Sequence, residues 1–155
     1  MAKEFRKRED EGNELIRRFE DHLRKKKTEF FDLDAYEEII DFYMLRSKHQ
    51  KALSAVNLAI DQYPYSIELT VIKAQILSHL EEYDQALELL DYAENLQPND
   101  SEILFTKGSI FSIRAKYIEA IDCYERALNL TDDKDEVYYN IGLAWQNLEK
   151  FDQAI

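Results

Sequence analysis

Tyr117-Ile118-Glu119-Ala120-Ile121 recurs 34 residues later as Phe151-Asp152-Gln153-Ala154-Ile155, with an aromatic residue, an alanine and an isoleucine in matching places. The same alanine position is filled at Ala86 and Ala52, again in steps of 34 residues. A second series of alanines and both prolines keep this step: Ala59, Ala93 and Ala127; Pro64 and Pro98. A fixed period of about 34 residues, with small residues at recurring places, is typical of an array of helical repeats.

The period divides the chain into units 33–66, 67–100 and 101–134, followed by an incomplete unit, 135–155. Each unit has two apolar stripes at helical spacing, such as Leu104–Phe111 and Tyr117–Leu128 in the third. Neither helix can bury its stripe alone, and an antiparallel pair still leaves one face bare, which the next unit covers. The sequence therefore predicts an all-α fold, with seven helices in 33–150 after one N-terminal helix.

The units resemble the tetratricopeptide repeat, whose pattern is a large residue, then Leu-Gly, Tyr, Ala, an aromatic residue and Pro. The third unit matches it with Leu104, Gly108, Phe111, Ala120, Tyr124 and Ala127, and the fourth with Tyr138, Ile141, Gly142, Trp145, Phe151 and Ala154. The resemblance covers residues 33–155 and implies a right-handed α-solenoid of antiparallel helix pairs. The core is expected to include Tyr36, Ala52, Leu77, Ala86, Leu90, Leu104, Phe111, Ala120, Tyr124, Ala127 and Trp145.

Several local features follow from the same register. Pro64 and Pro98 should end the second helices of their units, because proline lacks the N–H and clashes with the preceding turn. Ser47 followed by Gln50 predicts a capping box that opens a second helix. In the fourth unit a second helix should begin near Phe151, which would make the chain a fragment of a longer array. Ile141, Trp145 and Leu148 should then lack part of their cover.

Two lysines depart from the repeat pattern. Lys73 and Lys107 stand where the pattern has leucine. Their stems are expected to pack while their ammonium groups reach water, as long basic side chains do. The alternative is a repeated cation that meets an acid of a partner.

Residues 1–32 form a separate charged segment with 10 Lys and Arg against 9 Asp and Glu, and they lack the repeat. A stripe of Leu15, Ile16, Phe19 and Leu23 predicts a helix packed on the first unit. The segment ends in Arg24-Lys25-Lys26-Lys27, for which a nucleic-acid or membrane patch is the less favoured alternative given the neighbouring acids.

Composition argues against several classes of function. The net charge of −12 argues against a nucleic-acid surface, and no apolar run is long enough for a membrane span. A single cysteine, Cys123, cannot form an internal disulfide, which fits the cytoplasm. The three histidines lack metal-ligand spacing, and there is no phosphate-binding glycine-rich loop. We therefore expect a chain that is not an enzyme and needs neither cofactor nor metal.

The resemblance also indicates a working surface. In tetratricopeptide proteins the first helix of each unit lines a concave groove, and its register here gives a partner-binding set: Glu37, Asp41, Met44, Leu45, Val71, Gln75, His79, Phe105, Ser109, Ile113, Tyr139 and Leu143. The full set of groove positions contains no Lys or Arg. It also includes four carboxylates near helix starts: Asp34, Glu68, Glu102 and Glu136. Acids at helix starts are favoured by the helix dipole in any case.

One subclass of the family clamps C-terminal carboxylates with Lys, Asn and Arg in this groove. Glu37 and Asp41 occupy places where that clamp has Lys and Asn, so an acidic tail should be repelled. The prediction is a protein-interaction scaffold for a peptide or helix with basic and apolar residues. Two alternatives remain: the targeting arm of a longer enzyme or signalling protein, and self-association through the incomplete last unit.

Overall fold

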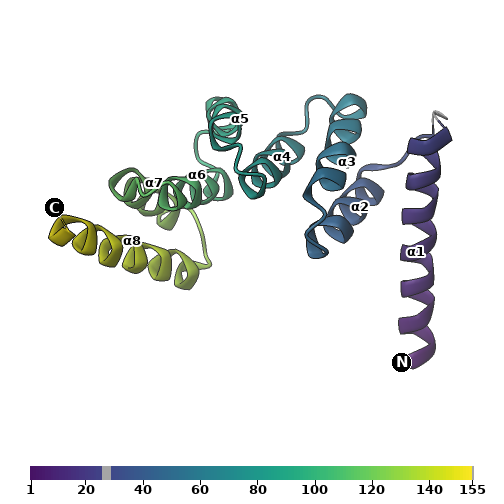
Figure 1. The fold of residues 1–155 in the computed structure, drawn as a ribbon, viewed down its shortest axis with the longest axis horizontal. Coiled ribbons are helices and arrows are strands. Elements are labelled where there is room, and N and C mark those ends of the chain that lie inside the picture. Colours follow the sequence, from purple (N-terminus) through teal and green to yellow (C-terminus); the bar gives the residue numbers. More distant parts are fainter. Residues whose placement is uncertain (26–28, 155) are drawn as a thin grey trace. The chain divides into compact units, whose positions relative to one another are not determined.

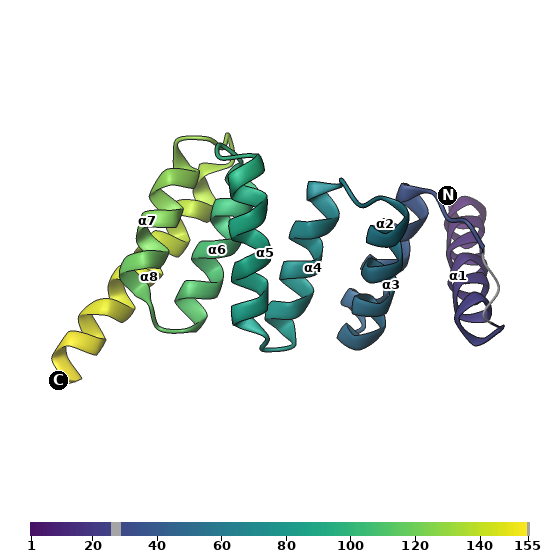
Figure 2. The same cartoon turned by 90° about the horizontal axis from the view of Figure 1, so that it is seen from above.

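The computed structural model describes residues 1–25 and 29–154, and in these residues it contains eight α-helices and no strand (Figures 1 and 2). The helices are α1 (Ala2–Lys25), α2 (Leu33–Leu45), α3 (His49–Gln62), α4 (Ile67–His79), α5 (Tyr83–Leu96), α6 (Ser101–Ile113), α7 (Tyr117–Leu128) and α8 (Lys134–Ala154). The all-α prediction and the seven helices expected after the N-terminal one are confirmed. Lys26 and Lys27 of the basic stretch, and Ile155 of the last unit, lie outside the described residues.

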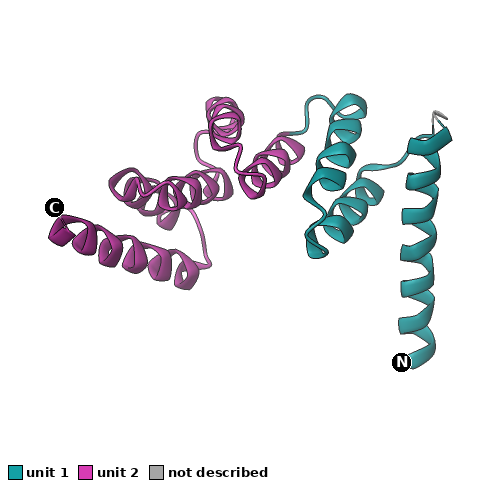
Figure 3. Cartoon of the chain, in the orientation of Figure 1, with its two compact units in different colours: residues 1–66 teal, residues 67–155 magenta. Residues whose placement is uncertain are grey.

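The chain forms two compact units, Met1–Ser66 and Ile67–Ile155 (Figure 3). In unit 1 the charged N-terminal helix packs on the first helix pair through an aromatic cluster. Phe19 is fully buried, and its ring centroid lies 5.9 Å from that of Phe31 and 6.3 Å from that of Tyr43. The predicted packing of this segment on the first repeat is confirmed.

Unit 2 consists of α4 to α8, in which each helix packs against the next along the chain. At Gly108 α6 and α7 approach so closely that a Cβ there would lie 2.7 Å from Cε1 of Tyr124. Because only glycine leaves room for that ring, the small residue predicted at this repeat position has a direct structural cause.

Most of the predicted core is buried, with relative exposures of 4% or less: Tyr36, Ala52, Leu77, Ala86, Leu90, Leu104, Ala120, Tyr124 and Ala127. Phe111 is half-buried and packs against the cluster around Tyr124. The prediction for Trp145 is wrong, because this side chain is 50% exposed.

The turns inside the helix pairs share one backbone geometry, which recurs every 34 residues. Ser47, Glu81 and Ala115 have φ of 55°, 63° and 58°, the left-handed conformation that closes a helix C-terminus. The next residue in each turn donates its N–H to the carbonyl five positions earlier, as Lys48 does to Tyr43 at 2.9 Å. The capping box predicted at Ser47 is therefore wrong: Ser47 closes α2, and α3 starts at His49 without a side-chain cap.

The fourth turn is absent. Glu149 stands in register with the three left-handed residues, but α8 runs straight through it to Ala154, so the second helix expected near Phe151 is not formed. A left-handed non-glycine residue costs about 1–2 kcal/mol, which a packed second helix offsets. In the described residues α8 instead continues as one helix to Ala154, and Trp145 stays 50% exposed.

The prolines act as predicted. Helices α3 and α5 end at Gln62 and Leu96, two residues before Pro64 and Pro98.

Candidate functional site

In unit 1, α2, the first helix of the helix pair, presents an acidic and apolar side. Asp41 is exposed, Glu37 and Met44 are half-buried, and Leu45 is 84% exposed. These four predicted residues are accessible on one helix of unit 1.

In unit 2 the first helices of two pairs, α4 and α6, lie beside each other. The side chain of Gln75 on α4 donates hydrogen bonds at 3.4 Å to Glu102 Oε1 and to Thr106 Oγ1 on α6. Val71 is only 4% exposed, so it supports this surface from within, whereas His79 is exposed near the end of α4.

The middle of the predicted face, on α6, is held in place by α7. The half-buried Phe105 ring packs 5.5 Å from the ring of Tyr124, and Ser109 accepts a hydrogen bond from the Tyr124 hydroxyl at 3.4 Å. Ile113, one turn beyond Ser109, is 60% exposed.

A hollow of about 200 Å³ opens where α6 meets the start of α8. Phe105, Ala127 and Val137 form its apolar lining, and carboxylates come from three residues: Glu102, Asp133 and Glu136. On the same helix, α8, the other two predicted residues are accessible, with Tyr139 67% and Leu143 37% exposed.

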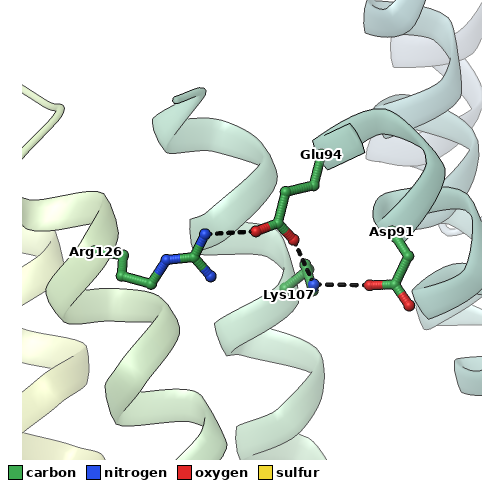
Figure 4. A network of polar contacts seen from close by, with 4 residues as sticks. All are labelled: Asp91, Glu94, Lys107 and Arg126. Atoms are coloured by element: carbon green, nitrogen blue, oxygen red, sulfur yellow. Dashed lines mark hydrogen bonds and ion pairs between the residues drawn. The ribbon is translucent and has the colours of Figure 1, made fainter. Parts of the chain in front are cut away.

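A polar network ties α5, α6 and α7 together (Figure 4). Lys107 Nζ lies 2.7 Å from Asp91 Oδ1 and 2.6 Å from Glu94 Oε2, and Arg126 Nη2 lies 2.6 Å from Glu94 Oε1. The Lys107 side chain is only 11% exposed, so the expectation that its ammonium reaches water is wrong. Its charge is neutralised inside unit 2, where it holds helices together.

The network shifts the pKa values of its members. Burial alone would raise the pKa of the Glu94 carboxyl, but hydrogen bonds from Lys107 and Arg126 hold it below its ordinary value. Burial would likewise lower the pKa of Lys107, but the bonds to Asp91 and Glu94 raise it. Nearby, burial raises the pKa of the Cys123 thiol to about 11, so the thiol is protonated and inert at neutral pH.

Two functional classes gain no support from the described residues. Nowhere in them do three or more His, Cys, Asp or Glu side chains gather in a way that could hold a metal ion. None of their helices combines the length and hydropathy that crossing a membrane requires.

Comparison with known proteins gives a family match over part of the chain. Residues 108–149 match the family described as TPR repeat, the tetratricopeptide repeat. The helix pairs of the described residues have the fold of that repeat. A comparison with curated proteins finds no match.

Solved tetratricopeptide structures share the fold. They include the first TPR of Spaghetti (RPAP3) bound to the HSP90 peptide SRMEEVD, with a TM-score of 0.65 and 22% identity over 74% of this chain and 90% of that one. The Sgt2 TPR domain from Aspergillus fumigatus has a TM-score of 0.69 and 18% identity over 77% and 81% of the two chains. MamA has a TM-score of 0.73 and 18% identity over 96% and 85%.

One feature of the tetratricopeptide units could have been found by comparing their registers. Glu94 and Lys107 occupy the places that Leu128 and Ile141 fill one repeat later. An acid and a base that both replace apolar residues at one repeat boundary indicate an internal ion pair.

A second feature had no sequence signal. A cleft of about 460 Å³ in unit 1 lies between α1 and the first helix pair, with Arg17, Glu20 and Lys51 in its lining. Glu20 accepts a hydrogen bond from the Tyr43 hydroxyl at 2.9 Å, and this bond lowers the pKa of its carboxyl. The bond joins α2 to α1, and α1 lies outside the repeated spacing.

Proposed function

We propose that this chain is a protein-interaction scaffold, and that unit 2 binds a peptide with basic and apolar side chains along α4, α6 and α8. The observation that carries the proposal is the hollow at Phe105, whose apolar floor is bordered by the carboxylates of Glu102, Asp133 and Glu136.

This hollow suits a lysine or arginine side chain. Such a side chain has an apolar stem that can lie on Phe105 and a charged head that can reach the surrounding carboxylates. Arginine fits better, because its planar guanidinium stays charged, stacks on aromatic rings and pairs with a carboxylate through two hydrogen bonds. Exposed Ile113, Tyr139 and Leu143 offer apolar contacts to the neighbouring residues of a peptide.

The repeat array of RPAP3 provides a useful contrast, since it is bound to the acidic HSP90 peptide SRMEEVD. We infer that this chain uses the same architecture with the opposite charge preference. Lys107 is not available to an acidic ligand, because Asp91 and Glu94 already pair with it. The acidic and apolar side of α2, with Glu37 and Asp41, is proposed to select the same ligand chemistry in unit 1.

The proposal is tested by fluorescence anisotropy with a labelled peptide of arginines and leucines. The double variant Glu102→Gln/Glu136→Gln should weaken binding about threefold or more, since exposed charge pairs contribute about 0.2–1 kcal/mol each. Glu88→Gln, a neutralisation at an exposed position on α5, is the matched control and should bind as the wild type does. Equal affinity of the double variant and the control would refute the site.

Charge reversal tests unit 1 separately. Glu37→Lys/Asp41→Lys should lower the affinity for the same peptide if α2 contributes to binding. An unchanged affinity would confine binding to unit 2.

A further inference from the structure

The side chain of Gln75 reaches from α4 to a carboxylate at the edge of the hollow on α6. Its amide nitrogen lies 3.4 Å from Glu102 Oε1 and 3.4 Å from Thr106 Oγ1. A carboxylate oxygen only accepts hydrogen bonds, so the amide must turn its NH₂ group toward Glu102, with one hydrogen for each acceptor. Thr106 is only 7% exposed and stands one turn after Glu102 on α6. Gln75 is therefore anchored at a buried hydroxyl and holds the Glu102 carboxylate.

The backbone of Glu102 is fixed as well. Asp100 caps α6, and its Oδ1 accepts hydrogen bonds from the N–H groups of Glu102 at 2.9 Å and Ile103 at 3.1 Å. The cap and the Gln75 amide together restrict both the backbone and the side chain of Glu102. A side chain that is already ordered loses less conformational freedom when it pairs with a ligand.

One repeat later the same support is missing. Glu136 stands in register with Glu102, and Ser109 takes the place of Gln75. The Ser109 hydroxyl donates its single hydrogen to the Phe105 carbonyl on its own helix, at 3.0 Å, so this hydrogen is not available to Glu136. Glu102 and Glu136 both border the hollow, but only Glu102 has the amide of the preceding repeat to orient it.

An oriented carboxylate distinguishes arginine from lysine. The guanidinium of arginine is planar and donates through a rigid fork, so it needs a carboxylate that faces it in one direction. The ammonium of lysine is a compact charge with three rotatable donors and accepts a carboxylate from many directions. The bond from Gln75 uses one of about four lone-pair sites on the Glu102 carboxylate, so both oxygens can still accept from a ligand.

We propose that Gln75 is a positioning residue that makes the hollow select arginine over lysine. This role rests on the proposed peptide site. Gln75 fixes the Glu102 carboxylate beside Phe105, where a guanidinium can stack on the ring and pair with the carboxylate at the same time.

The test compares two labelled peptides by fluorescence anisotropy, one of arginines and leucines and one with lysine in place of each arginine. The wild-type chain should bind the arginine peptide more tightly. Gln75→Met keeps the length and the unbranched shape of the side chain but has no donor. It should lower the affinity for the arginine peptide about twofold to tenfold, because Glu102 must then be ordered on binding. The affinity for the lysine peptide should stay nearly unchanged.

Gln85→Met is the matched control. Gln85 on α5 also donates to a glutamate, Glu82, at 3.2 Å, but it does not line the hollow, so neither affinity should change. In a Glu102→Ala background, which has no carboxylate to orient, Gln75→Met should cause no further loss. Gln75→Ala also removes the donor and should repeat the result of Gln75→Met, and circular dichroism checks that each variant is folded.

The outcomes separate this role from the proposed function. If neither peptide binds the wild-type chain, the peptide site is refuted, and the role of Gln75 with it. If the arginine peptide binds but the ratio of the two affinities is the same in the wild type and in Gln75→Met, the site stands and the role of Gln75 is refuted. A merely structural role would weaken both peptides equally, with and without Glu102→Ala, and this result would also overturn the proposal.

Discussion

The ion pair between Lys107 and Glu94 can be exchanged for an apolar pair that the chain itself already uses. Leu128 and Ile141 stand in register with Glu94 and Lys107, and both pack on the buried cluster between α7 and α8. The perturbation is therefore the set Glu94→Leu, Lys107→Ile and the double variant.

The expected magnitudes follow from the burial and from the partners that remain. The side chains of Lys107 and Glu94 are 11% and 16% exposed, so each charge has lost most of its water. Lys107→Ile leaves Glu94 with Arg126, and Glu94→Leu leaves Lys107 with the exposed Asp91. Breaking a fully buried pair costs about 3–5 kcal/mol, and a retained partner should reduce this to about 2 kcal/mol for each single variant. The double variant leaves neither charge behind, and it should lie within about 1 kcal/mol of the wild type or above it.

The assay is a double-mutant cycle of urea unfolding, which isolates the coupling between the two positions. Lys73→Ile, combined with Glu94→Leu, serves as the control, because Lys73 has the same register position one repeat earlier. Its effect should add to that of Glu94→Leu without coupling. The free energy of unfolding of Glu94→Leu/Lys107→Ile could instead fall by the sum of the decreases in the two single variants. The two charges would then be independent of each other, and the predicted coupling would be refuted.

Three further predictions concern packing, turns and pH. Gly108→Ala should destabilise the fold by about 1–3 kcal/mol, because the added Cβ overpacks against Tyr124. Gly142→Ala should stabilise the fold by about 0.5–1 kcal/mol, because its Cβ has open space and alanine favours the helix. Equal shifts of the thermal midpoint in the two variants would contradict this difference. Ala115→Gly should stabilise by about 0.5–1 kcal/mol, because φ at this residue is 58°, and an unchanged unfolding midpoint would show that the turn is unstrained. The stabilisation from the Glu94 carboxylate is present above the ordinary glutamate pKa of 4.5, and it is lost as pH falls through the lowered pKa of the folded state. The stabilisation from the Lys107 ammonium is present below the ordinary lysine pKa of 10.5, and it is lost as pH rises through the raised pKa of the folded state. Unfolding free energies measured across pH should show both losses in the wild type and neither in the double variant.

The repeat period was sufficient to predict the helices, because each helix must bury a stripe that recurs every 34 residues and the prolines mark two of the ends. The turns were not predictable in the same way. Ser47, Glu81 and Ala115 share a left-handed backbone but no residue type, so no glycine signal marks them. Ser47 in particular matched a capping pattern, and only the position of the last turn of α2 decides between the two roles.

The candidate site was predictable in part. The register placed Phe105 on the first helix of its unit, and the structure puts it in a hollow with Glu102 and Glu136, which the register also assigned to the groove. Asp133 joins them from the turn before α8, where no periodic pattern reaches. Val71 was expected at the surface, but its burial follows from packing between helices that a single-helix register does not describe.

The proposed peptide-binding surface is expected to select cationic, partly apolar ligands. The most direct measurement compares two peptides on the wild-type chain, one of arginines and leucines and one with glutamate in place of each arginine, at low and high salt. We expect that only the arginine peptide binds and that its affinity falls as salt is added, because exposed charges are screened beyond about 10 Å at 0.1 M. Tighter binding of the glutamate peptide, or an arginine-peptide affinity that does not change with salt, would contradict the claim.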